Sequence, residues 1–94
     1  MKIAGIIWLE EVIEKLEQRH AVKQEEVRQA LANLPRFRLV EKGHRRGENV
    51  YSGMAQTDSG RYLTIFFVHK KDNRALILSA RDMTDSERKR HGKK

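Results

Sequence analysis

The side chains best suited to chemistry in this chain are arginines, histidines and one glutamate in its C-terminal two thirds. Arg81 directly follows an apolar segment. A guanidinium held at the end of a strand can bind two phosphate oxygens. Histidine side chains titrate near neutral pH, so His44 or His91 could exchange protons. Glu87, in the basic C-terminal tail, could act as a base.

These residue types fit the needs of RNA cleavage without a metal. The reaction requires a base for the ribose 2′-hydroxyl, cations for the growing negative charge on the phosphate and an acid for the leaving 5′-oxygen. We expect Arg81 and Arg46 to stabilise the phosphate charge. We expect His44, His91 or Glu87 to transfer the protons.

Each candidate also has a structural interpretation. Arg81 could form a surface ion pair with Asp82 or Glu87, and Thr84 and Glu87 have the spacing of a helix capping box. The four histidines show no HxH or HExxH spacing, which argues against a metal site. No cofactor is expected, because GxGxxG, GK[ST] and GxSxG motifs are missing.

The distribution of charge indicates a polyanionic partner. The net charge is +7, yet residues 1–34 are almost balanced and the excess of cations lies entirely in residues 35–94. Attraction to phosphate speeds encounter and makes affinity fall with salt, for nucleic acids and anionic lipid surfaces alike. Besides the catalytic candidates, the cations expected to bind nucleic acid are Arg36, Arg38, Lys42, Arg45, Arg61, Lys89 and Arg90.

The hydrophobic pattern predicts two helices at the start of the chain. Apolar residues recur at helical spacing in two stretches, and Pro35 ends the second. These residues are Leu9, Val12, Ile13 and Leu16, then Val27, Ala30, Leu31 and Leu34. The short apolar segment from Ile3 to Trp8 could form an edge strand before them.

Beyond Pro35 the pattern changes to that of strands. Apolar residues alternate with Arg36 and Arg38, and further strands are predicted over residues 49–57, 62–68 and 75–80. Residues 84–91 predict a short basic helix capped by Thr84. We therefore expect one α+β domain over residues 1–94, with two N-terminal helices on one face of a three- to four-stranded antiparallel sheet and a short C-terminal helix.

Composition narrows the functional classes further. The chain has no cysteine, which excludes disulfides, thiolate metal sites and cysteine nucleophiles. Its longest apolar run is far shorter than the roughly 18 residues of a membrane span. The first residues lack the pattern of a secretory signal, so we expect a cytoplasmic protein.

Several segments resemble the BrnT-type toxins of bacterial type II toxin–antitoxin modules. The segment Gly60-Arg61-Tyr62-Leu63 is similar to the family's GR-x-L strand start, and residues 74–81 are similar to its "IRIISAR" strand. Residues 84–91 look like the family's "T-x-x-E-R" helix, and Arg19-His20-Ala21-Val22 is similar to its "KHGV". The resemblance covers nearly the whole chain and is most specific in its last third.

This resemblance implies a RelE-like fold and a cofactor-free endoribonuclease that cleaves mRNA and arrests translation. It also implies neutralisation by a ribbon-helix-helix antitoxin. Arg81 corresponds to the arginine of "SAR", and Glu87 and Arg88 correspond to the acidic and basic pair of the terminal helix. The alternative is a non-catalytic basic module that binds RNA or a protein partner on a toxin-like fold.

Overall fold

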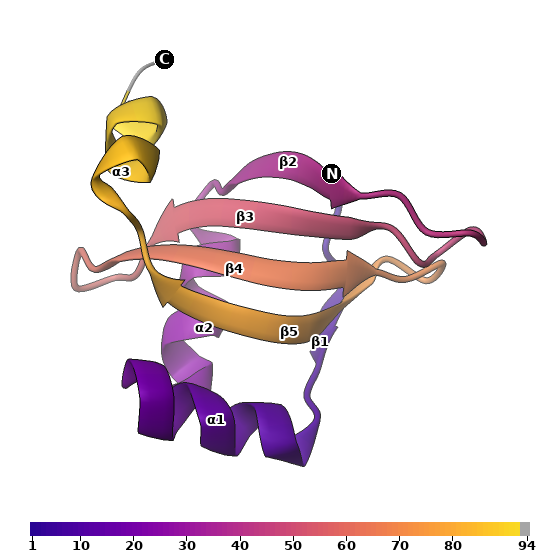
Figure 1. Cartoon of the computed structure of the whole chain (residues 1–94), viewed down its shortest axis with the longest axis horizontal. Coiled ribbons are helices and arrows are strands. Elements are labelled where there is room, and N and C mark those ends of the chain that lie inside the picture. The colour runs from indigo at the N-terminus through magenta and orange to yellow at the C-terminus, as the bar shows by residue number, and fades with distance from the viewer. Residues whose placement is uncertain (93–94) are drawn as a thin grey trace.

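The computed structural model describes residues 1–92. Three helices and five strands follow one another along the chain (Figure 1). Their bounds are β1 Gly5–Ile7, α1 Glu10–His20, α2 Gln24–Ala32, β2 Arg36–Glu41, β3 Val50–Gln56, β4 Tyr62–His69, β5 Arg74–Asp82 and α3 Asp85–Gly92. None of these helices is long and apolar enough to cross a membrane.

The strands form one five-stranded mixed sheet in the order β1-β5-β4-β3-β2. β2 to β5 are antiparallel, as the alternating pattern predicts, whereas β1 pairs parallel with β5. The expectation of three or four antiparallel strands was therefore wrong in both count and direction. The physical reason is that the outer edge of β5 is free to pair. The apolar segment near the N-terminus, which was expected as a possible edge strand, adds three residues to that edge as the parallel strand β1.

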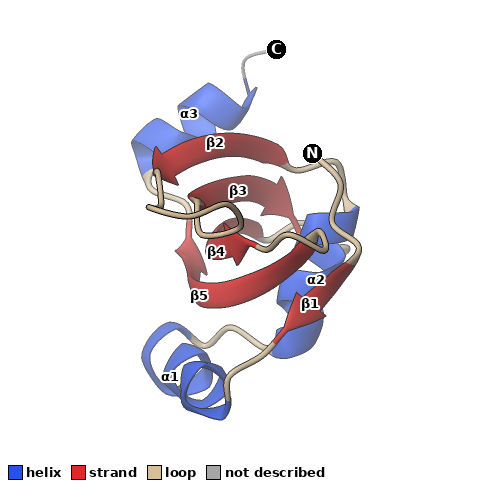
Figure 2. Cartoon of the chain, turned by 90° about the vertical axis from the view of Figure 1, so that its right-hand side faces the viewer, coloured by secondary structure: helices blue, strands red, loops and turns tan. Residues whose placement is uncertain are grey.

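Helices α1 and α2 bury a single hydrophobic core against one face of the sheet. This core combines Leu16 of α1 and Val27 of α2 with Ile65, Phe67 and Ile77 of the central strands, all of them at most 1 % exposed. Figure 1 shows α2 behind the sheet and α1 along the β5 side, and Figure 2 shows how strongly the sheet curls. The other face of the sheet, which we call the open face, is left to the short helix α3.

The predicted cap of α3 is confirmed. The Thr84 hydroxyl accepts a hydrogen bond from the Glu87 backbone N–H at 3.2 Å, and the Glu87 carboxylate accepts one from the Thr84 N–H at 2.9 Å. This capping box fixes the start of the helix just beyond β5. It also aims the Glu87 side chain back toward the sheet.

Arg61, at the start of β4, ties the helices to the sheet. Its guanidinium donates to the backbone carbonyls of His20 and Ala21, where α1 ends, at 3.0 and 2.7 Å. It also pairs with Glu26 of α2 at 3.1 Å and with Asp82 of β5 at 2.7 Å. All three guanidinium nitrogens therefore donate hydrogen bonds within the protein. The hydrogen bond from Arg61 is also the main cause that lowers the pKa of Asp82.

Replacing Arg61 should destabilise the fold rather than only remove a surface charge. Arg61→Ala leaves two helix-end carbonyls and two carboxylates without their donor, and we expect a loss of about 2 kcal/mol in the free energy of unfolding, measured by urea denaturation. Arg28→Ala, which removes an exposed pair with Glu25, serves as the control and should leave the free energy of unfolding close to that of the parent. Equal losses for the two variants would contradict this role.

Candidate functional site

The register of the sheet brings three arginines of distant strands onto the open face. Residues opposite each other on antiparallel strands lie on the same face. One row runs from Arg36 through Met54 and Thr64 to Arg81. The next row begins at Arg38 and continues through Ser52, Phe66 and Ser79. The alternation of Arg36 and Arg38 along β2 thus points both cations to the side of Arg81.

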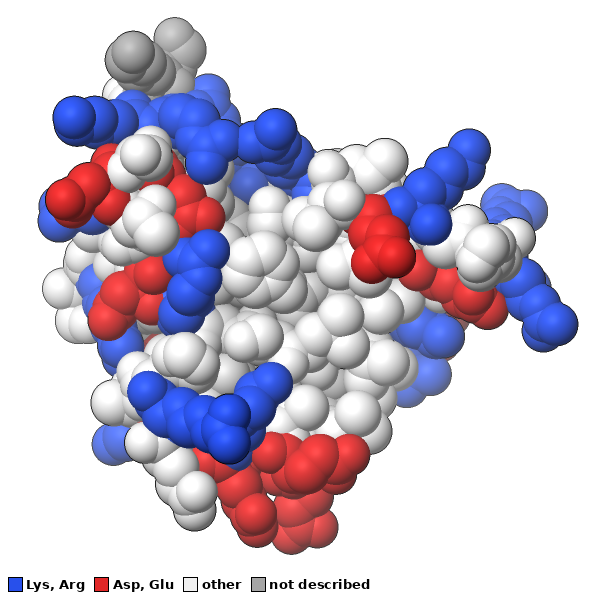
Figure 3. Space-filling view, viewed as in Figure 1, with Lys and Arg blue, Asp and Glu red and all other residues white. Residues whose placement is uncertain are grey.

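A cavity of about 350 Å³ lies where these rows meet α3. Arg38, Arg81 and Arg90 line it together with Glu87, so it contains three cations and one carboxylate. Its remaining walls come from Leu39, Val40, Ser52, Met54 and Phe66. Figure 3 shows blue side chains gathered at this end of the open face, around α3. We call this cavity, with Arg36 at its margin, the Arg81 site.

An ion pair between Arg81 and Glu87 occupies the centre of the Arg81 site. Two guanidinium nitrogens of Arg81 donate to the two carboxylate oxygens of Glu87 at 2.6 and 3.1 Å. The Thr64 hydroxyl donates to the same carboxylate at 3.1 Å from beneath. The guanidinium carbon of Arg81 lies 5.3 Å from the centre of the Phe66 ring. The ion pair expected as the structural interpretation of Arg81 is therefore present.

This pairing makes Glu87 a strong anion and a weak base. The hydrogen bond from Arg81 is the main cause that lowers the pKa of Glu87 to about 2, and bonds from Thr84 and Thr64 add to it. The same contact raises the pKa of Arg81. With its side chain 12 % exposed, Glu87 fills the fork of a guanidinium that would otherwise face solvent. The carboxylate thus stands where a phosphate would bind Arg81.

The opposite flank of α3 carries Arg88, Lys89 and His91. The guanidinium of Arg88 lies 4.2 Å from the centre of the Tyr62 ring, and the His91 ring meets the same tyrosine edge to face at 6.0 Å. These residues line a separate cavity with Gln56. The helix therefore separates His91 and Arg88 from Arg81 and Glu87, so these expected catalytic residues do not form one cluster.

The predicted loop residues lie at the other end of the sheet. His44, Arg45 and Arg46 are exposed in the connection between β2 and β3, as is Lys42. Figure 1 places this connection at the end opposite α3. His44 and Arg46 thus do not join Arg81 and Glu87, because the strands of the meander separate them. Arg61 does not join the open face either, since the fold uses its guanidinium.

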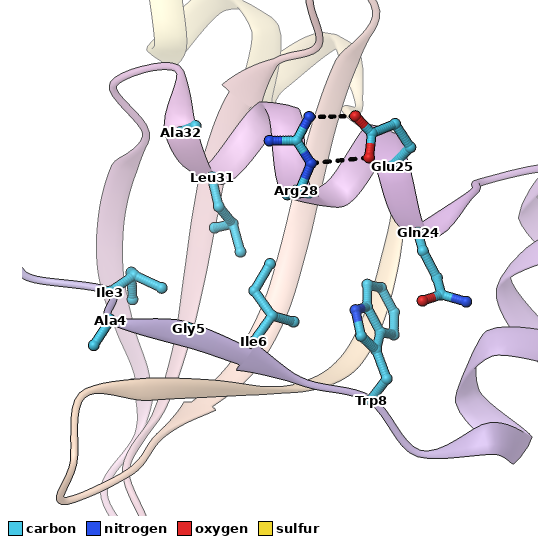
Figure 4. A pocket seen from close by; sticks show the side chains of 10 residues that line it. All are labelled: Ile3, Ala4, Gly5, Ile6, Trp8, Gln24, Glu25, Arg28, Leu31 and Ala32. Carbon is cyan, nitrogen blue, oxygen red and sulfur yellow. Dashed lines mark hydrogen bonds and ion pairs between the residues drawn. The ribbon is translucent and has the colours of Figure 1, made fainter.

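A more apolar cavity of about 400 Å³ lies between β1 and α2, away from these cations (Figure 4). The side chains of Ile6, Trp8 and Leu31 point into it. Its two charged residues, Arg28 and Glu25, are paired with each other. It therefore offers hydrophobic surface but no unpaired charge for catalysis.

Two features of the site were missed in the sequence. Thr64 is 1 % exposed although it lies on the open face, because Glu87 and Arg81 cover it. A threonine between apolar residues of β4 was the available signal. The second lies at the opposite end of the sheet, where the consecutive lysines Lys70 and Lys71 follow β4 and were not predicted to bind an anion. Within residues 1–92, no three His, Asp or Glu side chains are grouped to hold a metal ion.

The lowered pKa of Glu87 predicts a pH-dependent contribution to stability. A carboxyl group with a folded pKa of about 2 and an ordinary value of 4.5 stabilises the fold fully above pH 4.5, and this contribution is lost as the pH falls toward 2. Glu87→Gln, which can keep the helix cap, should cost about 2 kcal/mol at pH 7, after allowance for the partial exposure of Arg81.

The difference in unfolding free energy between the parent and Glu87→Gln should shrink between pH 4.5 and 2. Chemical denaturation across this range measures it. Glu14→Gln, at an exposed position of α1, is the control and should show no such trend. A constant difference for Glu87→Gln would mean that the ion pair does not stabilise the fold.

Comparison with known proteins gives no match: no family model matches the chain, and no curated protein matches it in sequence.

Proposed function

We propose that the protein is a metal-independent endoribonuclease that binds RNA at the Arg81 site, and that it acts as the toxin of a type II toxin–antitoxin module by cleaving mRNA. The observation that carries this proposal is the convergence of Arg38, Arg81 and Arg90 on one cavity of the open face. Within the described residues, no carboxylate forms an ion pair with Arg38 or Arg90, so both remain able to bind phosphate.

In the proposed reaction the ribose 2′-hydroxyl loses its proton, its oxygen attacks the adjacent phosphorus, the bond to the 5′-oxygen breaks, and the leaving 5′-oxygen takes a proton from water. The products are a 2′,3′-cyclic phosphate and a 5′-hydroxyl. Arg81, whose two parallel donors hold the Glu87 carboxylate at rest, would stabilise the negative charge that grows on the phosphate oxygens. Arg38 and Arg90 would hold the flanking backbone.

Glu87 gains basicity in this scheme only when substrate binds. A phosphate that enters the fork of Arg81 displaces the carboxylate and removes the main cause of its low pKa. Glu87, displaced from Arg81 but still close to it, can then accept the proton of the 2′-hydroxyl. The paired state is thus the resting state of the site.

A second candidate function is RNA binding without cleavage. Within the described residues, the lining of the Arg81 site includes no histidine, and its carboxylate is a weak base while paired. Phosphate binding needs only the arginines, whereas cleavage needs a proton acceptor and a donor. This observation favours the non-catalytic module expected as the alternative.

The proposal has consequences for fold family, partner and location. Strands of a curled sheet with one face uncovered support a RelE-like fold, and the resemblance to BrnT-type toxins points the same way. The cognate partner would be a ribbon-helix-helix antitoxin, for which the cationic open face offers electrostatic complementarity to an acidic segment. A toxin that acts on mRNA would work in the cytoplasm.

A cleavage assay in the presence of EDTA tests the proposal. The parent chain should cut single-stranded RNA and leave 2′,3′-cyclic phosphate ends, and Arg81→Ala should reduce the rate at least about 100-fold. Arg28→Ala is the matched control, because it also removes an arginine paired with a glutamate, but on α2. It should retain the parent rate within about twofold.

The assay separates the two candidate functions. RNA that is bound but not cut, with free RNA or with translating ribosomes, and whose binding is lost in Arg81→Ala, would establish the non-catalytic alternative. Cleavage that persists in a folded Arg81→Ala protein would overturn the assignment of the site. Denaturation of each variant shows whether it is folded.

A further inference from the structure

A second group of cations lies at the far end of the sheet. A cavity of about 360 Å³ is lined by five of them, from the β2–β3 loop and the β4–β5 turn. They are Arg45, Arg46, Lys70, Lys71 and Arg74. Two carboxylates, Glu48 and Asp72, share the cavity, and Asp72 is held by Arg74. Within residues 1–92, the other four cations form no ion pair, so the cavity carries an excess of unpaired positive charge.

The loop and the turn are packed together rather than merely close in space. Gly47 has a φ of +83°, and a Cβ atom there would lie 2.7 Å from Cγ and 2.9 Å from the backbone nitrogen of Lys71. Just below, the His69 N–H donates to the Asn49 carbonyl at 3.1 Å. This close contact holds cations from two separate connections around one cavity.

Arg74 connects the second cavity to the face that carries the Arg81 site, whereas Arg46 and Lys71 lie at the end of the sheet, where they also line a cavity with Tyr51 and His69. Leu76 pairs with Val68 and, through it, with Val50, in the row that follows Phe66 on the open face. Arg74 lies two residues before Leu76 on β5, so its side chain is on this face too. From Thr64 in β4 to Lys70, just past the end of that strand, six residue steps correspond to about 20 Å.

The centre of the surface between the two cationic sites is apolar, and one exposed carboxylate, Glu41, lies at its β2 border, opposite Val50. Phe66, Val68 and Leu76 are all partly exposed there. Figure 3 shows the white centre of this face with charged side chains at both ends. Aromatic and apolar side chains accept the faces of unpaired bases, while cations bind the backbone.

We propose that the open face binds one continuous single strand of RNA, whose phosphates contact the Arg81 site at one end and the Arg46–Lys71 cavity at the other. This inference rests on the proposed function and adds a substrate requirement to it. The strand must be long enough to reach both sites. A single strand fits better than a duplex, because the floor between the sites offers surface for bases and no cation for a second backbone.

Fluorescence anisotropy with 2′-O-methyl oligouridylates tests this proposal without cleavage. Arg46→Ala/Lys71→Ala should weaken binding of a 12-mer at least about tenfold and leave binding of a trimer unchanged. For this variant and the 12-mer, the slope of log affinity against log salt concentration should be smaller in magnitude by about 1.4, the value for two phosphate contacts on a single strand. The control Arg19→Ala/Arg28→Ala removes the same charge from the helices and should change 12-mer affinity by less than about twofold.

The variants distinguish failure of this inference from failure of the proposed function. If Arg81→Ala weakens the 12-mer and Arg46→Ala/Lys71→Ala does not, the Arg81 site stands and the second contact is wrong. If neither variant changes the affinity, both proposals fail. A matched 12-base-pair duplex that binds as tightly as the single strand, and depends on the same residues, would overturn the choice of a single strand.

Discussion

The guanidinium of Arg61 joins the two N-terminal helices to the sheet. Arg61 lies where the end of α1, the start of α2 and the last residue of β5 come together, and it donates a hydrogen bond to each of them. Backbone carbonyls at a helix end need a donor, and carboxylates that are partly buried need a cation. A single side chain meets both needs. Together with the hydrophobic core, it fixes the helical pair against one face of the sheet and leaves the other face to α3.

The open face carries different kinds of side chain at its two ends and at its centre. At one end α3 folds back over the sheet, and its capping glutamate occupies the fork of Arg81. At the other end two connections bring basic side chains around a glycine contact. The centre of the surface between them is apolar. This arrangement of cations at two ends and apolar side chains between them is the basis of the proposed binding of a single RNA strand.

The sequence allowed the two helices, the antiparallel strands and the cap of α3 to be predicted, because each has a strong local pattern. It did not reveal the parallel pairing of β1, since three apolar residues carry no information about their partner. Alternation along β2 predicted that Arg36 and Arg38 lie on one face, whereas the register of the sheet was needed to place Arg81 on that same face. The division of the catalytic candidates was missed, although a meander places alternate connections at opposite ends. His44 and Arg46 therefore had to lie far from the end of β5.

β2 forms one border of the sheet, and its outer backbone groups have no neighbouring strand within the described residues. Leu39 and Val40 are about half exposed there, beside a bulge in the pairing with β3. Open edges of this kind invite pairing with another chain, and charged side chains and bulges discourage it. Arg36 and Arg38 therefore have a second effect, because their charge protects this border from aggregation. A polyanion bound there as proposed would neutralise them and remove that protection, which would link colloidal stability to the proposed function through the same two side chains.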